Sequence, residues 1–299
     1  MTQSYQDRIA NGYKLGRFML SRFIRLAPLN LLASTAGLVV VALMLHSNSV
    51  PENLSANQLA YSYVLSIFFI PNFNELSWPF GTEIQVGGLF PLNLPAWSLF
   101  LEWIAYLTFF CVFKYLQKYI TYLWILFLLC YGALSIAYQM DNPGWNQATL
   151  SQGISRVLFG FFTGVVIRQN LKEFESVNTI LLFLISATAF LLLLFGDARL
   201  SLINTFLFVP ITIKLLAALK IDRVYKQICS AFGEISFPLY MIHVPFATLV
   251  YSQLGLFRVL SPVIQIAVLS ILTIVLAFIL GVCDTRLRKM INAKLSTML

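Results

Sequence analysis

One carboxylate stands in an otherwise apolar stretch at residues 95–113, PAWSLFLEWIAYLTFFCVF. This residue is Glu102, and a cation, Arg156, stands in a second apolar stretch, SQGISRVLFGFFTG. A charged side chain at mid-membrane costs about 2.5–3.5 kcal/mol on insertion scales, so each residue is a candidate for function. Each lies about six residues in from the predicted outer end of its helix. At 1.5 Å rise per residue, this places both side chains roughly 9 Å below the outer membrane surface. Equal depth permits an ion pair between them.

Two interpretations of this pair stay open. In the first, Glu102 and Arg156 form a structural ion pair that orders a helix bundle. In the second, they line a polar cavity through which a substrate reaches a catalytic group, because ionisable residues inside membranes mark substrate pathways.

Histidine and arginine residues supply the other candidates. His243, in GEISFPLYMIHVPF, falls near the middle of a predicted span and is either a packing residue or a functional one, whereas His46 is expected at the membrane interface. Arg22 and Arg25 are three residues apart and so share one helix face. They either anchor the chain at the cytoplasmic surface or clamp an anionic ligand such as a phosphate-bearing carrier, which suits the planar fork of arginine.

The composition places these residues in a membrane protein. Of the 299 residues, 59% are hydrophobic and 11% are charged, whereas soluble domains carry about 25% charged residues. The mean hydropathy is +0.81. The net charge of +8 fits basic residues at the ends of membrane spans better than nucleic-acid binding. The four cysteines form no C-x-x-C pair, so we expect small buried apolar residues and neither a metal site nor a disulfide.

The apolar runs, each long enough to cross a bilayer core of about 30 Å, predict an all-α polytopic bundle of eight spans. We expect one integral membrane domain over residues 1–299, with spans near 28–46, 96–113, 119–138, 150–167, 177–195, 200–219, 231–250 and 261–283. Pro28 is expected to open the first span, where its missing N–H costs nothing. Backbone groups in lipid must be satisfied internally, which requires helices or closed barrels.

Charge fixes the predicted orientation. Basic residues precede the first span and follow the last one, so both termini are expected in the cytoplasm. The apolar run at residues 59–71 would invert every later loop if it crossed the membrane, and it is short for a crossing. We therefore expect a re-entrant or interfacial segment there, on the outer side.

Four segments together resemble the membrane acyltransferase family type 3, the O-acyltransferases of bacterial surface polysaccharides. In chain order they are RFMLSRFIRLAPL, PAWSLFLEWIAYLTF, GISRVLFGFFTGVVI and FGEISFPLYMIHVPF. The resemblance implies transfer of an acyl group, commonly acetyl, from cytoplasmic acyl-CoA to a hydroxyl of a cell-surface or exopolysaccharide sugar. It implies a multi-pass protein of the bacterial cytoplasmic membrane. Its partners would be acyl-CoA and a carbohydrate or lipid-linked carbohydrate acceptor, with no bound cofactor, metal or nucleic acid.

The resemblance also implies roles for individual residues. Arg22 and Arg25 match an R-x-x-R motif that meets the acyl-CoA donor. The remaining matches are Trp97, Ser98 and Glu102 of a W-S-L-x-x-E motif, and Gly233, Ser236, Tyr240 and His243 of a segment in which Phe237 replaces the usual tyrosine. We expect Glu102 and His243 as catalytic candidates, and Arg22, Arg25, Trp97, Ser98, Arg156, Ser236 and Tyr240 as substrate-binding candidates.

One departure from the family bears on activity. The family has about ten spans, and its proposed catalytic histidine lies on the first of them, whereas this sequence resembles the family from the end of the second span onward. We expect the DNA upstream of Met1 to encode a span with a histidine. His243 is the histidine placed deeply enough to substitute as the base. A membrane transporter and a catalytically inactive remnant or partner subunit are the alternative functions.

Overall fold

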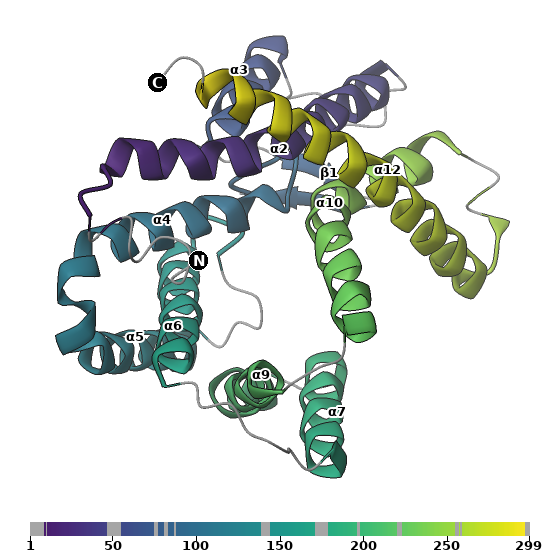
Figure 1. The fold of residues 1–299 in the computed structure, drawn as a ribbon. Coiled ribbons are helices and arrows are strands. Elements are labelled where there is room, and N and C mark those ends of the chain that lie inside the picture. The colour runs from purple at the N-terminus through teal and green to yellow at the C-terminus, as the bar shows by residue number, and fades with distance from the viewer. Residues whose placement is uncertain are drawn as a thin grey trace. The chain divides into compact units, whose positions relative to one another are not determined.

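The computed structural model describes residues 9, 11–46, 55–74, 77–80, 83–86, 88–138, 144–170, 179–195, 198–219, 223–254, 257 and 259–296. These residues form mostly helices (Figure 1). The elements are α2 (Leu15–His46), α3 (Ala56–Ile67), β1 (Ser77–Phe80), β2 (Glu83–Val86), α4 (Ala96–Val112), α5 (Leu116–Tyr138), α6 (Leu150–Gln169), α7 (Thr179–Phe195), α8 (Ala198–Ile203), α9 (Val209–Ala218), α10 (Arg223–Gln253) and α12 (Pro262–Ser296). A 3-10 turn, Phe113–Tyr115, leads into α5, and a π-helical turn, Asn204–Phe208, joins α8 to α9.

The predicted fold class is confirmed. In the described part of the chain, six helices are long and apolar enough to cross a membrane, and two shorter apolar helices, Ala96–Val112 and Ile180–Phe195, accompany them. Together they fall on the eight predicted spans. The protein is therefore a polytopic helical membrane protein.

Several helices run beyond their apolar segments. The helix α2 has 32 residues, about 48 Å at 1.5 Å per residue, and it begins well before the predicted span at residue 28. Its extension carries Arg17, Arg22 and Arg25, and α12 likewise continues past its apolar part through Arg286 and Arg288. The prediction that Pro28 opens a span is wrong, because Pro28 lies inside α2. Proline is tolerated within membrane helices where neighbouring groups satisfy the freed carbonyl.

Contacts divide the chain into two compact units. Unit 1 comprises Met1–Leu15, Leu101–Gly144 and Ala148–Lys226, and unit 2 comprises Gly16–Phe100, Trp145–Gln147 and Gln227–Leu299. The expectation of one integral membrane domain over residues 1–299 stays a prediction.

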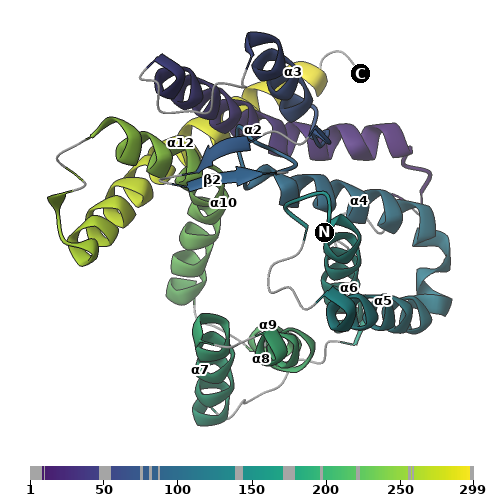
Figure 2. The same cartoon turned by 180° about the vertical axis from the view of Figure 1, so that it is seen from behind.

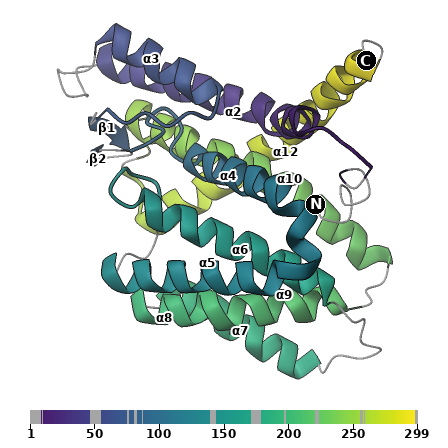
Figure 3. The same cartoon turned by 90° about the vertical axis from the view of Figure 1, so that its left-hand side faces the viewer.

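In unit 1, α5 packs along α6 (Figure 3). Aromatic rings fill this part of the core: Phe159 of α6 lies 5.1 Å from Phe206, and Tyr131 of α5 lies 5.2 Å from Phe206, both between ring centroids. An indole N–H of α5 adds a polar tie, since Trp124 Nε1 donates to Thr163 Oγ1 at 2.9 Å. Rings that share Phe206 as a neighbour, and polar bonds such as this one, therefore hold the α5–α6 pair together.

In unit 2, α3 runs antiparallel along α2 (Figure 3). Leu59, near the start of α3, clusters with Val41, and Tyr63 OH lies 2.8 Å from Thr35 Oγ1. Asn30 Nδ2 then donates to the Ser66 carbonyl at 2.7 Å near the end of α3. At 12 residues, or about 18 Å, α3 is too short to cross a membrane. Its contacts run from Val41 to Asn30, inside the predicted span 28–46, which favours the re-entrant interpretation over the interfacial one.

The two strands of unit 2 form an antiparallel hairpin (Figure 2), in which Ser77 pairs with Val86 and Phe80 with Glu83. Also in unit 2, α12 packs against α10 at Gly281, where a Cβ would lie 3.4 Å from Pro238 Cγ, in ordinary van der Waals contact.

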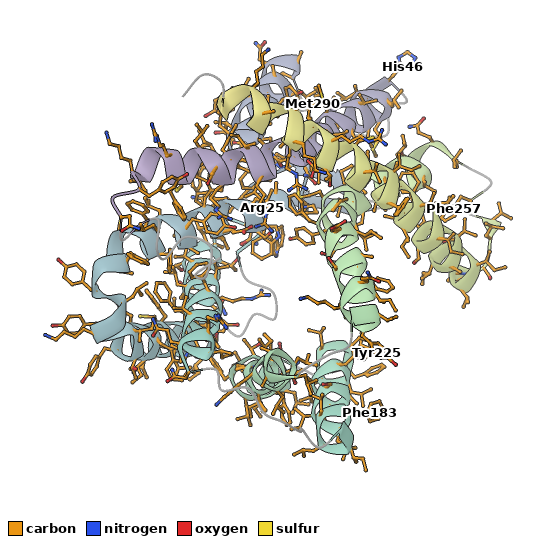
Figure 4. All side chains as sticks on the ribbon, viewed as in Figure 1. Arg25, His46, Phe183, Tyr225, Phe257 and Met290 are labelled. Carbon is orange, nitrogen blue, oxygen red and sulfur yellow. The ribbon has the colours of Figure 1, made fainter. Side chains whose placement is uncertain are left out.

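Large apolar side chains cover the outer faces of the helices. Phe183 of α7 is 70% exposed and points away from its neighbours (Figure 4). Such faces suit lipid contact in a membrane protein. The prediction that the four cysteines are buried is wrong, because Cys111, Cys130, Cys229 and Cys283 are all exposed on helices. Hydropathy alone does not separate a lipid-facing position from a core position.

Candidate functional site

Glu102 lies on the buried face of α4 in unit 1. At 100° per residue it falls among Leu101, Ala105, Tyr106 and Phe109, all of which are buried. Its carboxylate Oε1 accepts a hydrogen bond from the Tyr106 hydroxyl one turn further along the helix. Tyr106 is itself 3% exposed and packs edge-on against Phe161 of α6. A buried phenol therefore orients this carboxylate.

Arg156 lies on α6, the helix that packs beside this part of α4. A Cβ on Gly153 would lie 3.2 Å from Leu101 Cδ1, and the rings of Phe109 and Phe161 are 5.6 Å apart between centroids. Both helices advance in the same direction between these two contacts, so they are parallel. Glu102 and Arg156 both lie in the interval between the contacts. The two charged candidates thus occupy one stretch of the α4–α6 pair.

A buried amide accompanies Arg156. Gln152, one turn earlier on the same face of α6, is fully buried, and its Nε2 donates to Ser135 Oγ of α5 at 3.3 Å. The Gln152 Oε1 atom is buried and has no hydrogen-bond partner. Such an atom commonly marks a place where water or a ligand completes the bonding. Together with Glu102 and Arg156, this amide makes the α4–α6 interval polar.

In unit 2, two of the sequence motifs meet at one backbone atom. The Pro95 carbonyl oxygen accepts hydrogen bonds from Ser98 Oγ at 3.0 Å and from the Tyr240 hydroxyl of α10 at 3.2 Å. It also accepts from the Ser98 N–H at 3.2 Å. Trp97, the neighbouring residue on α4, is partly exposed. The start of α4 and the middle of α10 are therefore joined at Pro95.

His243 stands one turn beyond Tyr240 on α10. Its Nδ1 lies 2.7 Å from the Tyr240 carbonyl oxygen, and the two rings are 5.8 Å apart between centroids. A carbonyl oxygen only accepts, so Nδ1 carries the hydrogen, and in the neutral ring the lone pair is on Nε2. The side chain is exposed and not buried as the sequence suggested. Its Nδ1 bonds to a carbonyl of its own helix, and the ring is otherwise exposed.

The remaining candidate residues differ in how exposed their side chains are. Arg22 of α2 is 5% exposed, with its guanidinium 5.6 Å from the centre of the Phe18 ring. Arg25, labelled in Figure 4, is exposed, so the two arginines of this helix face differ in the exposure of their side chains. Ser236 is exposed and donates to the Gly233 carbonyl of its own helix at 2.8 Å.

Some residues of these groups escaped the sequence analysis. Tyr106 and Gln152 carry no charge at neutral pH, so they do not stand out in an apolar stretch as Glu102 and Arg156 do. Their spacing from Glu102 and Arg156, one helical turn in each case, was the available signal. Within the described residues, no group of three or more His, Cys, Asp or Glu side chains could hold a metal ion.

The fold and these groups define a polytopic membrane protein with polar clusters on its spans. The sequence model of a family described as an acyltransferase domain, acyltransferase family 3, matches residues 8–282. The chain therefore belongs to acyltransferase family 3, as its motifs predicted, and is a membrane acyltransferase. Neither curated proteins nor solved structures gave a significant match.

Proposed function

We propose that this chain transfers an acyl group, expected to be acetyl, from cytoplasmic acyl-CoA to a sugar hydroxyl of a cell-surface or exopolysaccharide. The acceptor is a carbohydrate or a lipid-linked carbohydrate, and the protein lies in a bacterial cytoplasmic membrane with both termini in the cytoplasm. Family membership supports acyl transfer in general. The observation that carries the more specific proposal is the His243 ring, whose Nδ1 is occupied by the Tyr240 carbonyl.

Acyl transfer to a hydroxyl needs a general base. The acceptor oxygen attacks the thioester carbonyl carbon and forms the C–O bond, and the hydroxyl proton moves to the base. The C–S bond then breaks, and the CoA thiolate leaves and takes up a proton. In this chain His243 is assigned as the base, since an Nδ1 that donates to a carbonyl leaves the Nε2 lone pair to accept the proton.

The polar groups of unit 1 are assigned to orienting a substrate. Tyr106 holds the Glu102 carboxylate by a hydrogen bond, and Gln152 offers an unpartnered oxygen near Arg156. Groups held in place by packed neighbours stabilise developing charge without reorganising during the reaction. Glu102 is therefore proposed as a catalytic residue and Arg156 as a substrate-binding residue.

The arginines of α2 are assigned to the donor. Arg22 and Arg25 lie on the basic extension of the helix, and guanidinium groups bind phosphate oxygens in a bidentate manner. Trp97, Ser98, Ser236 and Tyr240 are proposed to contact substrate, with Ser98 and Tyr240 fixed by their shared bond to Pro95.

The proposal is tested by the acetyl content of surface polysaccharide in a host strain deleted for its own enzyme. Expression of this chain is expected to restore O-acetyl groups, measured by NMR of the purified polysaccharide, and Glu102→Ala is expected to abolish them. Counterflow of a labelled solute, with no acetyl transfer by the unaltered chain, would instead favour a transporter. An inactive chain that co-purifies with a second membrane protein bearing the family's proposed catalytic histidine would identify a partner subunit.

A further inference from the structure

Two non-helical segments of unit 2 pack beside α2 within its predicted span 28–46, which places them at membrane depth if that prediction holds. The first follows α3 at residues 68–74, and Asn30, which contacts the end of α3, is about 24 Å along α2 from His46 at 1.5 Å per residue. The second is residues 88–95, where a Cβ on Gly37 would lie 1.7 Å from the Leu92 carbonyl oxygen. Non-helical backbone at this depth is tolerated only where it is buried in protein or lines a watery cavity.

Buried polar side chains gather on these segments and on the face of α2 beside them. They include Asn30 and Ser34 of α2, Ser62 and Ser66 of α3, Asn72 and Asn93. Part of the set is internally satisfied, since Asn72 Nδ2 donates to Ser62 Oγ at 2.8 Å and Asn30 Nδ2 donates to the Ser66 carbonyl. These bonds fix α3 and its following turn against α2.

Four side-chain atoms of this polar set make no hydrogen bond. Asn93 Nδ2, Asn93 Oδ1, Ser34 Oγ and Asn30 Oδ1 are buried and have no hydrogen-bond partner, although all three residues are 0% exposed. The main chain of Asn93 is satisfied, because its N–H donates to Phe90 and its carbonyl accepts from Ala96. The free bonding capacity therefore belongs to side chains. An unsatisfied buried polar group is costly and requires an explanation such as a bound ligand or water.

The three residues lie on one face of α2 and on the loop that packs against it. Ser34 lies one turn before Gly37 on the buried face of α2, and Asn93 follows Leu92, whose carbonyl lies against Gly37. Asn30 lies one further turn along the same face. This juxtaposition places the Ser34 hydroxyl one turn from the point where α2 meets the loop of Asn93, with the Asn30 amide one turn further along α2.

The segments that carry and surround Asn30, Ser34 and Asn93 contain no charged side chain. Residues 29–46, 55–74 and 88–95 contain no Asp, Glu, Lys or Arg. A phosphate or carboxylate ligand would lack a countercharge there, whereas amide and hydroxyl groups match the donors and acceptors of a neutral hydroxyl. We propose that Asn30, Ser34 and Asn93 bind the hydroxyl groups of a neutral sugar, which rests on the proposed function because that sugar is the acyl acceptor.

The test uses the full chain in lipid nanodiscs and saturation-transfer NMR with methyl glucoside, methyl galactoside and methyl mannoside as probes. At least one probe is expected to receive saturation. Asn93→Leu, which removes both amide atoms at similar volume, and Ser34→Ala are each expected to weaken that binding about tenfold. The control is Thr35→Val on the same helix, which removes a bond to Tyr63 outside the site and is expected to leave sugar binding unchanged.

Thermal unfolding separates a ligand site from a structural one. Removing unsatisfied polar atoms is expected to leave the unfolding temperature of Asn93→Leu and Ser34→Ala unchanged or raised. Unchanged sugar binding in both variants, loss of folded protein in both, or no saturation of any probe by the unaltered chain overturns the proposal. Transfer of acetyl groups without sugar saturation contradicts this site alone, whereas saturation that Asn93→Leu removes, without any acetyl transfer, supports the site and contradicts the proposed function.

Discussion

Ser98 and Tyr240, on helices far apart in the sequence, donate hydrogen bonds to the same atom, the Pro95 carbonyl oxygen, from 3.0 and 3.2 Å. The start of the W-S-L-x-x-E motif, at Ser98, and the segment that ends in His243 are thereby tied to each other within unit 2. Ser98 and Tyr240 therefore hold the start of α4 against α10, close to the proposed base His243.

The shared acceptor predicts coupling between the two side chains. Ser98→Ala and Tyr240→Phe are each expected to lower stability by about 0.5–1.5 kcal/mol, the net contribution of one hydrogen bond. Because one carbonyl serves both donors, the double variant is expected to differ from the sum of the single ones. Denaturant unfolding of all four proteins measures this, and strict additivity would show that the bonds are independent.

The packing around α6 predicts a difference between two glycines of this helix. A Cβ on Gly153 would lie 2.4 Å from Gly144 Cα, whereas one on Gly160 meets nothing within 4 Å. We expect Gly153→Ala to destabilise by about 1–3 kcal/mol through overpacking. Gly160→Ala is the matched control, and its better helix propensity is expected to stabilise by up to about 1 kcal/mol. Equal unfolding temperatures for the two variants would contradict this packing.

Asp284 and Arg288 on α12 predict a pairwise effect. Their side chains are 2.6 Å apart, and the Asp284 side chain is nearly fully buried while that of Arg288 is 31% exposed. Arg288→Met leaves a buried carboxylate without its cation and is expected to cost about 1–3 kcal/mol. Arg286→Met, at an exposed position of the same helix, is expected to change stability by less than about 0.5 kcal/mol. Thermal unfolding of both variants measures this. A larger loss of stability for Arg286→Met than for Arg288→Met would contradict the proposed ion pair.

Tyr106 predicts a graded loss of activity around Glu102. Glu102→Gln keeps the shape and removes the charge, and it is expected to lower kcat/KM for acyl transfer by about 100-fold or more. Tyr106→Phe removes only the hydrogen bond to the carboxylate and is expected to lower it by about tenfold. Initial rates with labelled acetyl-CoA measure both. A Tyr106→Phe loss as large as that of Glu102→Gln would mean that the hydroxyl itself takes part.

The eight spans and the short helix near residues 59–71 could be predicted from the sequence, because length and apolarity in lipid leave few alternatives. Charge bias ruled out a crossing at residues 59–71, and α3 is indeed too short to cross. The position of α3 along α2 depends on the Asn30–Ser66 hydrogen bond, and hydropathy does not predict such a tertiary contact. The basic extension of α2 was missed because a search for apolar runs stops at Arg25, although arginine is a good helix former.

Of the candidate site, the charged residues could be found but their partners could not. Glu102 and Arg156 stand out by charge, whereas Tyr106 and Gln152 are distinguished only by what they contact. The exposure of His243 was missed because span position gives depth along a helix and not the face that a residue occupies. The convergence on Pro95 depends on a tertiary contact between α4 and α10.

Acyl transfer in sealed membrane vesicles tests the central claim most directly. Labelled acetyl-CoA is supplied to the cytoplasmic face, and label in polysaccharide is counted for the unaltered chain, His243→Gln and the control His46→Gln. We expect transfer by the unaltered chain and by His46→Gln, and a loss of about 10²–10⁴-fold in His243→Gln, the contribution of a general base. Transfer that His243→Gln leaves intact, or no transfer by the unaltered chain, would contradict the account.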